Sequence, residues 1–145
     1  MKLTEFRWVN AIWSDDIRQE VGNKPSFMGV YTGGLVFTAL PAILPRLAVW
    51  VSIHTPKSRP IQRLKVRVVR NDFDEPLATL EVAEMQMPPP SESETPAALS
   101  LSFAMLLGAT QITSDTKWLK IFVDTEDEVL ESFKLTVQTA SSAAA

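Results

Sequence analysis

The sequence predicts an all-β protein: a single-domain antiparallel sandwich of two sheets with eight or nine strands, of the immunoglobulin-like or C2-like kind. Two observations support this prediction. Apolar and polar residues alternate with period two along several segments, which is typical of strands with one buried face. Ten prolines divide the 145 residues into short pieces and leave little room for helices. A small β-barrel is the alternative architecture.

Four strands are expected in the first part of the chain. The connection between the first two ends in the turn 22–25, and Gly33-Gly34 supplies another turn. A helix of one or two turns over 14–20 is an open alternative, because Ser14 can cap it. The four expected strands are residues 5–14, 26–31, 35–38 and 46–54.

Five more strands are expected in the rest of the chain, with hairpin connections at 71–76 and 125–128. Their alternation predicts that Leu80 and Val82 are buried, and that Phe133 shares an inner face with Leu135 and Val137. The five expected strands are residues 63–68, 77–82, 98–105, 117–124 and 131–138.

The sandwich domain is expected to occupy residues 1–139, followed by a flexible Ser/Ala tail at 140–145. Residues 87–96, rich in Pro, Ser and Glu, read as an exposed loop. An apolar fraction of 46% is enough for a core without disulfides or a structural metal.

Composition also narrows the class of protein. The chain has no cysteine, which excludes disulfides, zinc–cysteine sites and a thiol nucleophile, and favours a soluble cytoplasmic protein. No apolar run has the length of a membrane span. A net charge of −3 disfavours nucleic acid as a partner. No cofactor motif is present, so no cofactor is expected.

A row of cations is the first candidate binding surface. Arg63, Lys65 and Arg67 alternate along one strand and point to one face. Such a row can bind phosphates, carboxylates or an acidic partner. The alternative is a solvated face that is paired across strands with acids such as Glu81.

The acidic cluster of Asp15, Asp16 and Glu20 is a weak candidate for a divalent cation, since carboxylate oxygens suit calcium or magnesium. The spacing of a calcium loop is absent, so a solvated turn is the competing interpretation and no metal site is predicted. His54, the only histidine, ends a strand without an evident partner, and no catalytic residue is assigned.

Two tryptophans give the strongest functional hint. Trp50 lies opposite the aliphatic face of its strand, and Trp118 does the same in a later strand. If the aliphatic faces form the core, both indoles lie outside, where tryptophan often anchors an interface. The alternative is that other segments cover them.

The first half of the chain also carries a family layout, A-x-x-x-D-D-x-R-x-E over 11–20, then G-x-K, x-x-G-V-Y and L-P-x-x-L-P-x-L over 22–24, 27–31 and 40–47. This layout resembles an uncharacterised family of short bacterial and bacteriophage proteins, known only as a domain of unknown function. The resemblance implies a β-sandwich and a bacterial or phage origin, and it implies no activity.

The function is not determined by these observations, and three hypotheses stay open. The leading one is a non-enzymatic protein-interaction or assembly module that can self-associate. The second is a phage or mobile-element accessory protein that binds a host protein or nucleic acid through Arg63, Lys65 and Arg67. The third is a cation-dependent binder or hydrolase that uses Asp15, Asp16 and Glu20.

Overall fold

A computed structural model describes residues 6–86 and 98–140. All twelve regular elements in these ranges are β-strands, which confirms the predicted all-β class. The described residues include no helix with the length and apolar character needed to cross a lipid bilayer. The strands are β1 Trp8–Glu20, β2 Lys24–Val30, β3 Leu35–Phe37, β4 Ala42–Leu44, β5 Leu47–Pro56, β6 Leu64–Arg70, β7 Ala78–Val82, β8 Ala98–Leu107, β9 Thr110–Ile112, β10 Trp118–Asp124, β11 Val129–Glu131 and β12 Leu135–Thr139.

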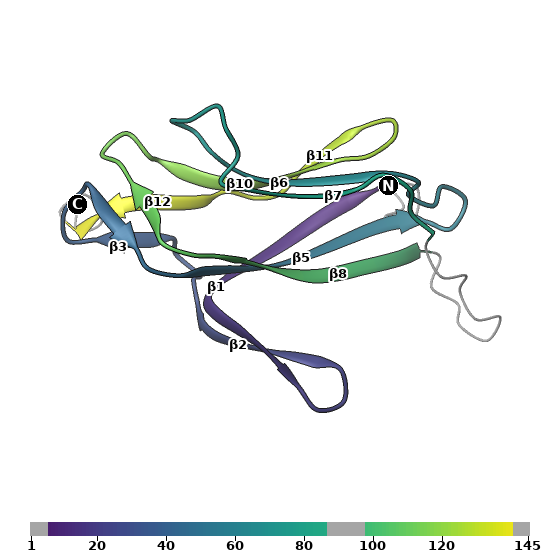
Figure 1. The fold of residues 1–145 in the computed structure, drawn as a ribbon, viewed down its shortest axis with the longest axis horizontal. Helices are drawn as coiled ribbons and strands as arrows, with labels where there is room; N and C mark the ends of the chain where they lie inside the picture. Colours follow the sequence, from purple (N-terminus) through teal and green to yellow (C-terminus); the bar gives the residue numbers. More distant parts are fainter. Residues whose placement is uncertain (1–5, 87–97, 141–145) are drawn as a thin grey trace.

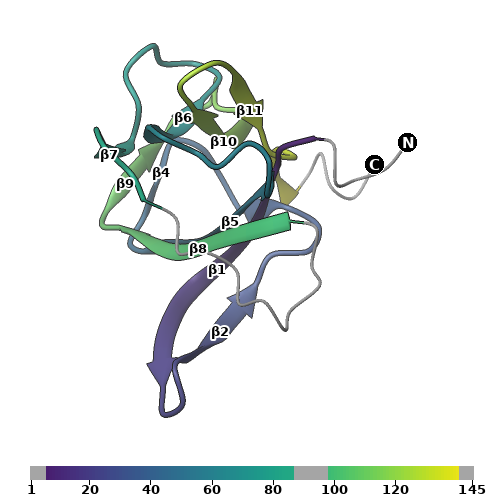
Figure 2. The same cartoon turned by 90° about the vertical axis from the view of Figure 1, so that its right-hand side faces the viewer.

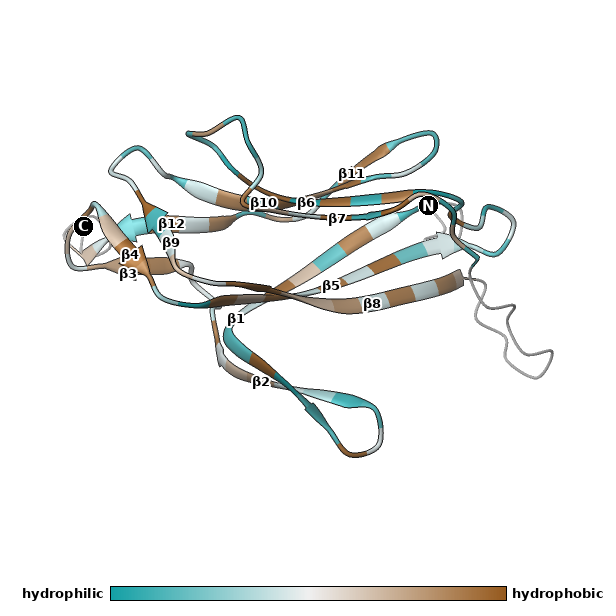
Figure 3. Ribbon diagram, in the orientation of Figure 1, coloured by the Kyte–Doolittle hydropathy of each residue, from teal (hydrophilic) through white to brown (hydrophobic). Residues whose placement is uncertain are grey.

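The strands form two stacked layers (Figure 1). One sheet has the order β2-β1-β5-β8, and the other has the order β3-β12-β10-β6-β7 with β11 paired to β10. A small pair, β4 with β9, lies at one end of the layers (Figure 3). The predicted antiparallel sandwich is thus confirmed, with one exception: β12 and β3 run parallel.

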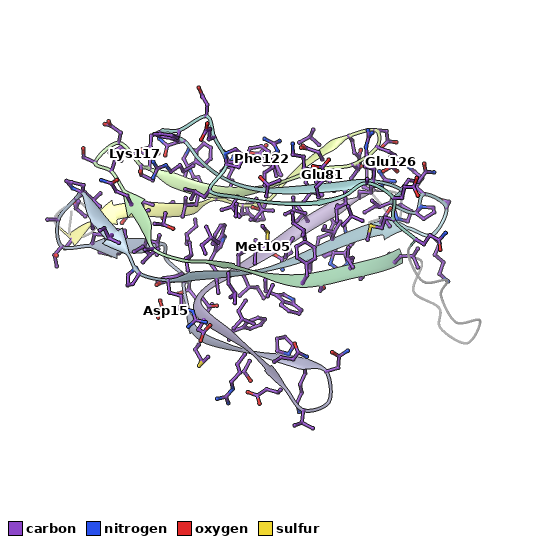
Figure 4. The ribbon with its side chains drawn as sticks, viewed as in Figure 1. Asp15, Glu81, Met105, Lys117, Phe122 and Glu126 are labelled. Atoms are coloured by element: carbon purple, nitrogen blue, oxygen red, sulfur yellow. The ribbon has the colours of Figure 1, made fainter. Side chains whose placement is uncertain are left out.

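The core lies between the inner faces of β5, β6 and β10. Burial alternates along these strands in the predicted period, and Met105 on β8 also lies between the layers (Figure 4). Removing these side chains from water is the main favourable term in folding. The innermost side chains, each at most 1% exposed, are Leu47, Val49, Val51, Ile53, Leu64, Val66, Val68, Leu119, Ile121 and Val123.

A buried arginine holds one end of the sandwich together. The Arg7 side chain is only 1% exposed, and its guanidinium donates six hydrogen bonds of 2.5 to 3.3 Å. A guanidinium withdrawn from water is stable only when its donors are satisfied in this way. Its acceptors come from β5, from the β5–β6 connection and from the β10–β11 turn. They are the side chains of Thr55, Thr125, Glu126 and Asp127 and the carbonyls of Arg59 and Pro60.

A second polar cluster holds the opposite end. The Asp72 carboxylate accepts hydrogen bonds from the hydroxyls of Thr113, at 2.6 Å, and Thr116, at 2.9 Å, and it lies 3.3 Å from Arg70 Nε. Desolvation by itself would raise the pKa of Asp72. The two hydroxyl donors and the Arg70 charge outweigh it and hold this pKa below its usual value.

Three local predictions are wrong. The first strand was expected to end at Ser14, but it continues to Glu20 because residues 16–20 pair with β2 across the Gly22-Asn23 turn, and the open helical alternative over 14–20 is not adopted. The expected strand 131–138 is divided between β11 and β12, and Phe133 in the break is 94% exposed. Leu80 points inward on the edge strand β7 but stays 39% exposed, since no described strand lies beyond it.

The strand count also exceeds the prediction, because the short strands β4, β9 and β11 have three residues each. Alternation over three residues is too brief to separate a strand from a loop. The expected loop 87–96 lies outside the described residues, as does the tail from residue 141 onward.

We predict that Arg7→Ala lowers the free energy of unfolding by about 3 kcal/mol, because it leaves several partly buried acceptors without a donor. Urea denaturation followed by circular dichroism measures this. The matched control is Arg18→Ala, whose side chain is 69% exposed in its pair with Glu20 and should change stability by less than about 1 kcal/mol. Equal losses in the two variants would contradict the role given to Arg7.

Candidate functional site

The most distinctive surface feature is a two-stranded arm, which we define as residues 15–29. Strand β1 pairs with β5 only from Trp8 to Ser14, and beyond Ser14 it pairs with β2 alone. Figures 1 and 2 show this hairpin standing away from the two layers. No residue of the arm belongs to the buried core or packs against it. The arm therefore serves no purpose in covering the core.

The base of the arm is fixed by a close approach of Asp15 to Gly29. Gly29 has a φ of +69°, and a Cβ at this position would lie 2.2 Å from Asp15 Oδ2. Only glycine therefore fits here without displacing the carboxylate. Asp15 reaches across to accept a hydrogen bond from the Tyr31 hydroxyl. Figure 4 labels Asp15 at this junction between arm and sheet.

The Tyr31 hydroxyl is a weaker acid than an ordinary tyrosine because it is partly buried and bonded to Asp15. Desolvation, the hydrogen bond to Asp15 and the negative charge of Asp15 together raise the pKa of Tyr31 to about 12. Burial disfavours the charged phenolate, ionisation removes the hydroxyl that donates to Asp15, and the new charge would form next to the carboxylate.

An aromatic contact lies on the outer face of the four-stranded sheet. The Phe27 ring on β2 meets the Trp50 ring on β5 edge to face, with centroids 5.8 Å apart, although β1 lies between these strands in the sheet. Ile12 of β1 is paired in register with Trp50. Trp50, Phe27 and Ile12 are each only half-buried. Trp50 therefore lies on the outer face, as the alternation predicts, and the arm partly covers it.

A polar row follows on the same face. The rings of Trp8 and His54 stack at 3.8 Å, and His54 Nδ1 is 2.8 Å from the Ser100 hydroxyl. Partial burial lowers the pKa of His54 and favours the neutral imidazole. A serine beside an imidazole is the first part of a nucleophile–base set, which also needs a group to orient the base. Within the described residues His54 has no carboxylate partner, and its ring packs against Trp8.

The acidic cluster does not come together. Asp15 bonds Tyr31, Asp16 forms a 2.7 Å ion pair with Arg46, and Glu20 pairs with Arg18 at 2.8 Å. The described residues contain no group of three acidic or histidine side chains able to hold a metal ion. Each carboxylate instead has its own local partner along the arm or at its base.

The basic row is partly neutralised. Arg67 makes two hydrogen bonds of 2.9 Å to Asp124 on β10 and lies over the Phe122 ring at 5.3 Å. Lys65 is paired in register with Glu81 on one side and with Asp124 on the other. Arg63 precedes β6. Of the two interpretations of this row, the geometry favours a solvated face paired with acids.

Trp118 also lies on an outer face, that of the second sheet, and is half-buried. The Lys120 ammonium sits 5.0 Å from its ring and also pairs with Glu131. A cation over an indole is a favourable contact in itself. Trp118 thus has a charged neighbour of its own and differs from Trp50, whose neighbours are apolar.

Sequence reasoning missed the arm and its contact to Trp50. The turn at Gly22-Asn23, where both residues have positive φ, was expected, but residues 15–20 before it were predicted as a connection and not as a strand of a hairpin. The partner of Trp50 gives no such signal, since Phe27 is brought to it only by the path of β1 and β2. Comparisons of the chain with protein-family models, curated proteins and solved structures found no match. The family resemblance therefore stays a prediction.

We predict that the tyrosinate absorbance of the protein titrates with a midpoint at about pH 12, and that Asp15→Asn moves it toward the ordinary value of about 10. Tyr31 is the only tyrosine, so the signal has one source. The control is Asp16→Asn, which alters the adjacent carboxylate but not the one bonded to Tyr31. A midpoint unchanged by Asp15→Asn would contradict the contact.

Proposed function

We propose that this protein is a non-enzymatic interaction module that recognises a protein partner through the arm and the half-buried Trp50 beside it. The observation that carries the proposal is the arm itself. A two-stranded hairpin is only marginally stable in water without further packing. A hairpin that contributes nothing to the core is best explained by a partner that it contacts.

The chemistry of the arm suits a protein partner. Its tip exposes Val21 almost completely, and Met28 and Val30 are exposed near its base. Exposed apolar side chains near the base of a projecting segment can form part of a protein-interaction surface. Trp50 adds an aromatic anchor of the kind that contributes most to interface affinity.

Charge is balanced across the same surface. Asp16 pairs with Arg46 and Glu20 with Arg18, so the arm has no unpaired row of a single sign. A partner held mainly by phosphate contacts needs such a row of cations. The proposal therefore favours a largely apolar protein contact over a nucleic acid.

A photo-crosslinking amino acid at Met28 is predicted to capture a protein in an extract of the source organism. The same amino acid at Phe73, an exposed aromatic on the β6–β7 connection, is the matched control and should capture nothing specific. The combined change Phe27→Ala and Trp50→Ala should reduce the Met28 yield by about tenfold or more, as expected for loss of an anchor worth about 1.4 kcal/mol or more.

Trp118→Ala should leave that yield unchanged. Circular dichroism confirms that each variant is folded. The proposal is wrong if Met28 and Phe73 give the same products, or if Trp118→Ala lowers the yield as much as the double variant does.

A further inference from the structure

Strand β8 is a long free edge. It is the last strand in the order β2-β1-β5-β8, and no described strand pairs with its outer edge. Its backbone N–H and C=O groups on that side have no ladder partner within the described residues. An edge of this kind is a template for another strand unless the protein blocks it.

The other edges of the two sheets are blocked. Strand β2 carries Lys24 and Pro25, and β7 has only five residues and includes Glu81. Strand β3 has three residues. Charge, proline and shortness are the usual protections of an exposed edge. Strand β8 has ten residues, ALSLSFAMLL, with none of these protections, and Figure 3 shows no strongly hydrophilic segment along it.

We infer that β8 pairs antiparallel with β8 of a second copy, about a twofold axis at Ser102. The inference concerns a different surface from the arm and goes beyond the proposed function. A twofold axis perpendicular to the sheet places paired residues on the same face. The numbers of two paired residues must therefore add up to an even number. With Ser102 opposite its own counterpart, Leu101 faces Phe103 of the second copy and Ser100 faces Ala104.

This register fits both faces. On the inner face Leu101 and Phe103 are only half-buried, and pairing across the axis removes more of their apolar area from water. On the outer face the Ser52 and Ser102 hydroxyls are 2.9 Å apart, and the row continues through the axis into the second copy. Cross-strand hydroxyl pairs stabilise antiparallel sheets.

Electrostatics favour a second copy as the occupant. Neither β8 nor its neighbour β5 contains a Lys, Arg, Asp or Glu, so the twofold brings no like charges together. The segment 87–97 is a poor alternative, because four prolines in eleven residues remove backbone donors that a ladder needs.

Oxidative cross-linking tests this register, since the natural chain has no cysteine. Ser102→Cys places two thiols on the axis, with Cα atoms about 5 Å apart, within reach of a disulfide. Ser100→Cys is the matched control on the same exposed face, and its Cα atoms would be about 14 Å apart. We expect a disulfide-linked dimer from Ser102→Cys and at least about tenfold less from Ser100→Cys.

Light scattering on the purified natural chain provides the second measurement. We expect a mass near twice 16.1 kDa, and a rise of about tenfold or more in the dimer dissociation constant for Ser102→Lys, which puts like charges on the axis. Phe27→Ala should still dimerise, which separates this inference from the arm. The inference is overturned by a monomer at all concentrations, by equal cross-linking at the two serines, or by dimers that form only when 87–97 is replaced by a Gly/Ser linker.

Discussion

The structure depends on one constraint: each central strand has a single face to bury, and the only place to bury it is between the two sheets. The inner side chains of β5 meet those of β6 and β10 there and are almost fully withdrawn from water. Arg7 at one end and the Asp72 cluster at the other tie the connecting segments to this layer. Outer faces, edges and the arm are left free for other roles.

The same constraint explains which parts of the fold were predictable. Alternation along β5, β6 and β10 correctly predicted the inner face, because each of these strands has one buried face and one more exposed face. Alternation failed at Phe133, which lies in a break between two short strands. It also failed for residues 15–20, where a strand paired only with β2 buries neither face fully and carries no periodic signal.

The candidate site was predictable in its parts but not in its assembly. Trp50 was expected outside the core and lies there, yet its neighbour Phe27 follows from the path of the arm, which depends on Gly29. Lys65 and Arg67 lie on one face of β6, as the alternation predicts, whereas Arg63 precedes the strand. The pairing of Arg67 with Asp124 could not be predicted from the sequence, because it depends on the register between β6 and β10. Likewise, Arg7 gave no sign in the sequence that it would be buried.

Hydrogen exchange followed by mass spectrometry tests the central claim, which is that a tightly packed body carries an arm stabilised separately from it. Amides of β5, β6 and β10 should open only with global unfolding, whereas arm amides at 16–20 and 24–28 should exchange faster by about a hundredfold or more. Purified protein without a partner is the right sample. Arm amides protected as strongly as those of β5 would contradict the account, because the arm would then be part of the body.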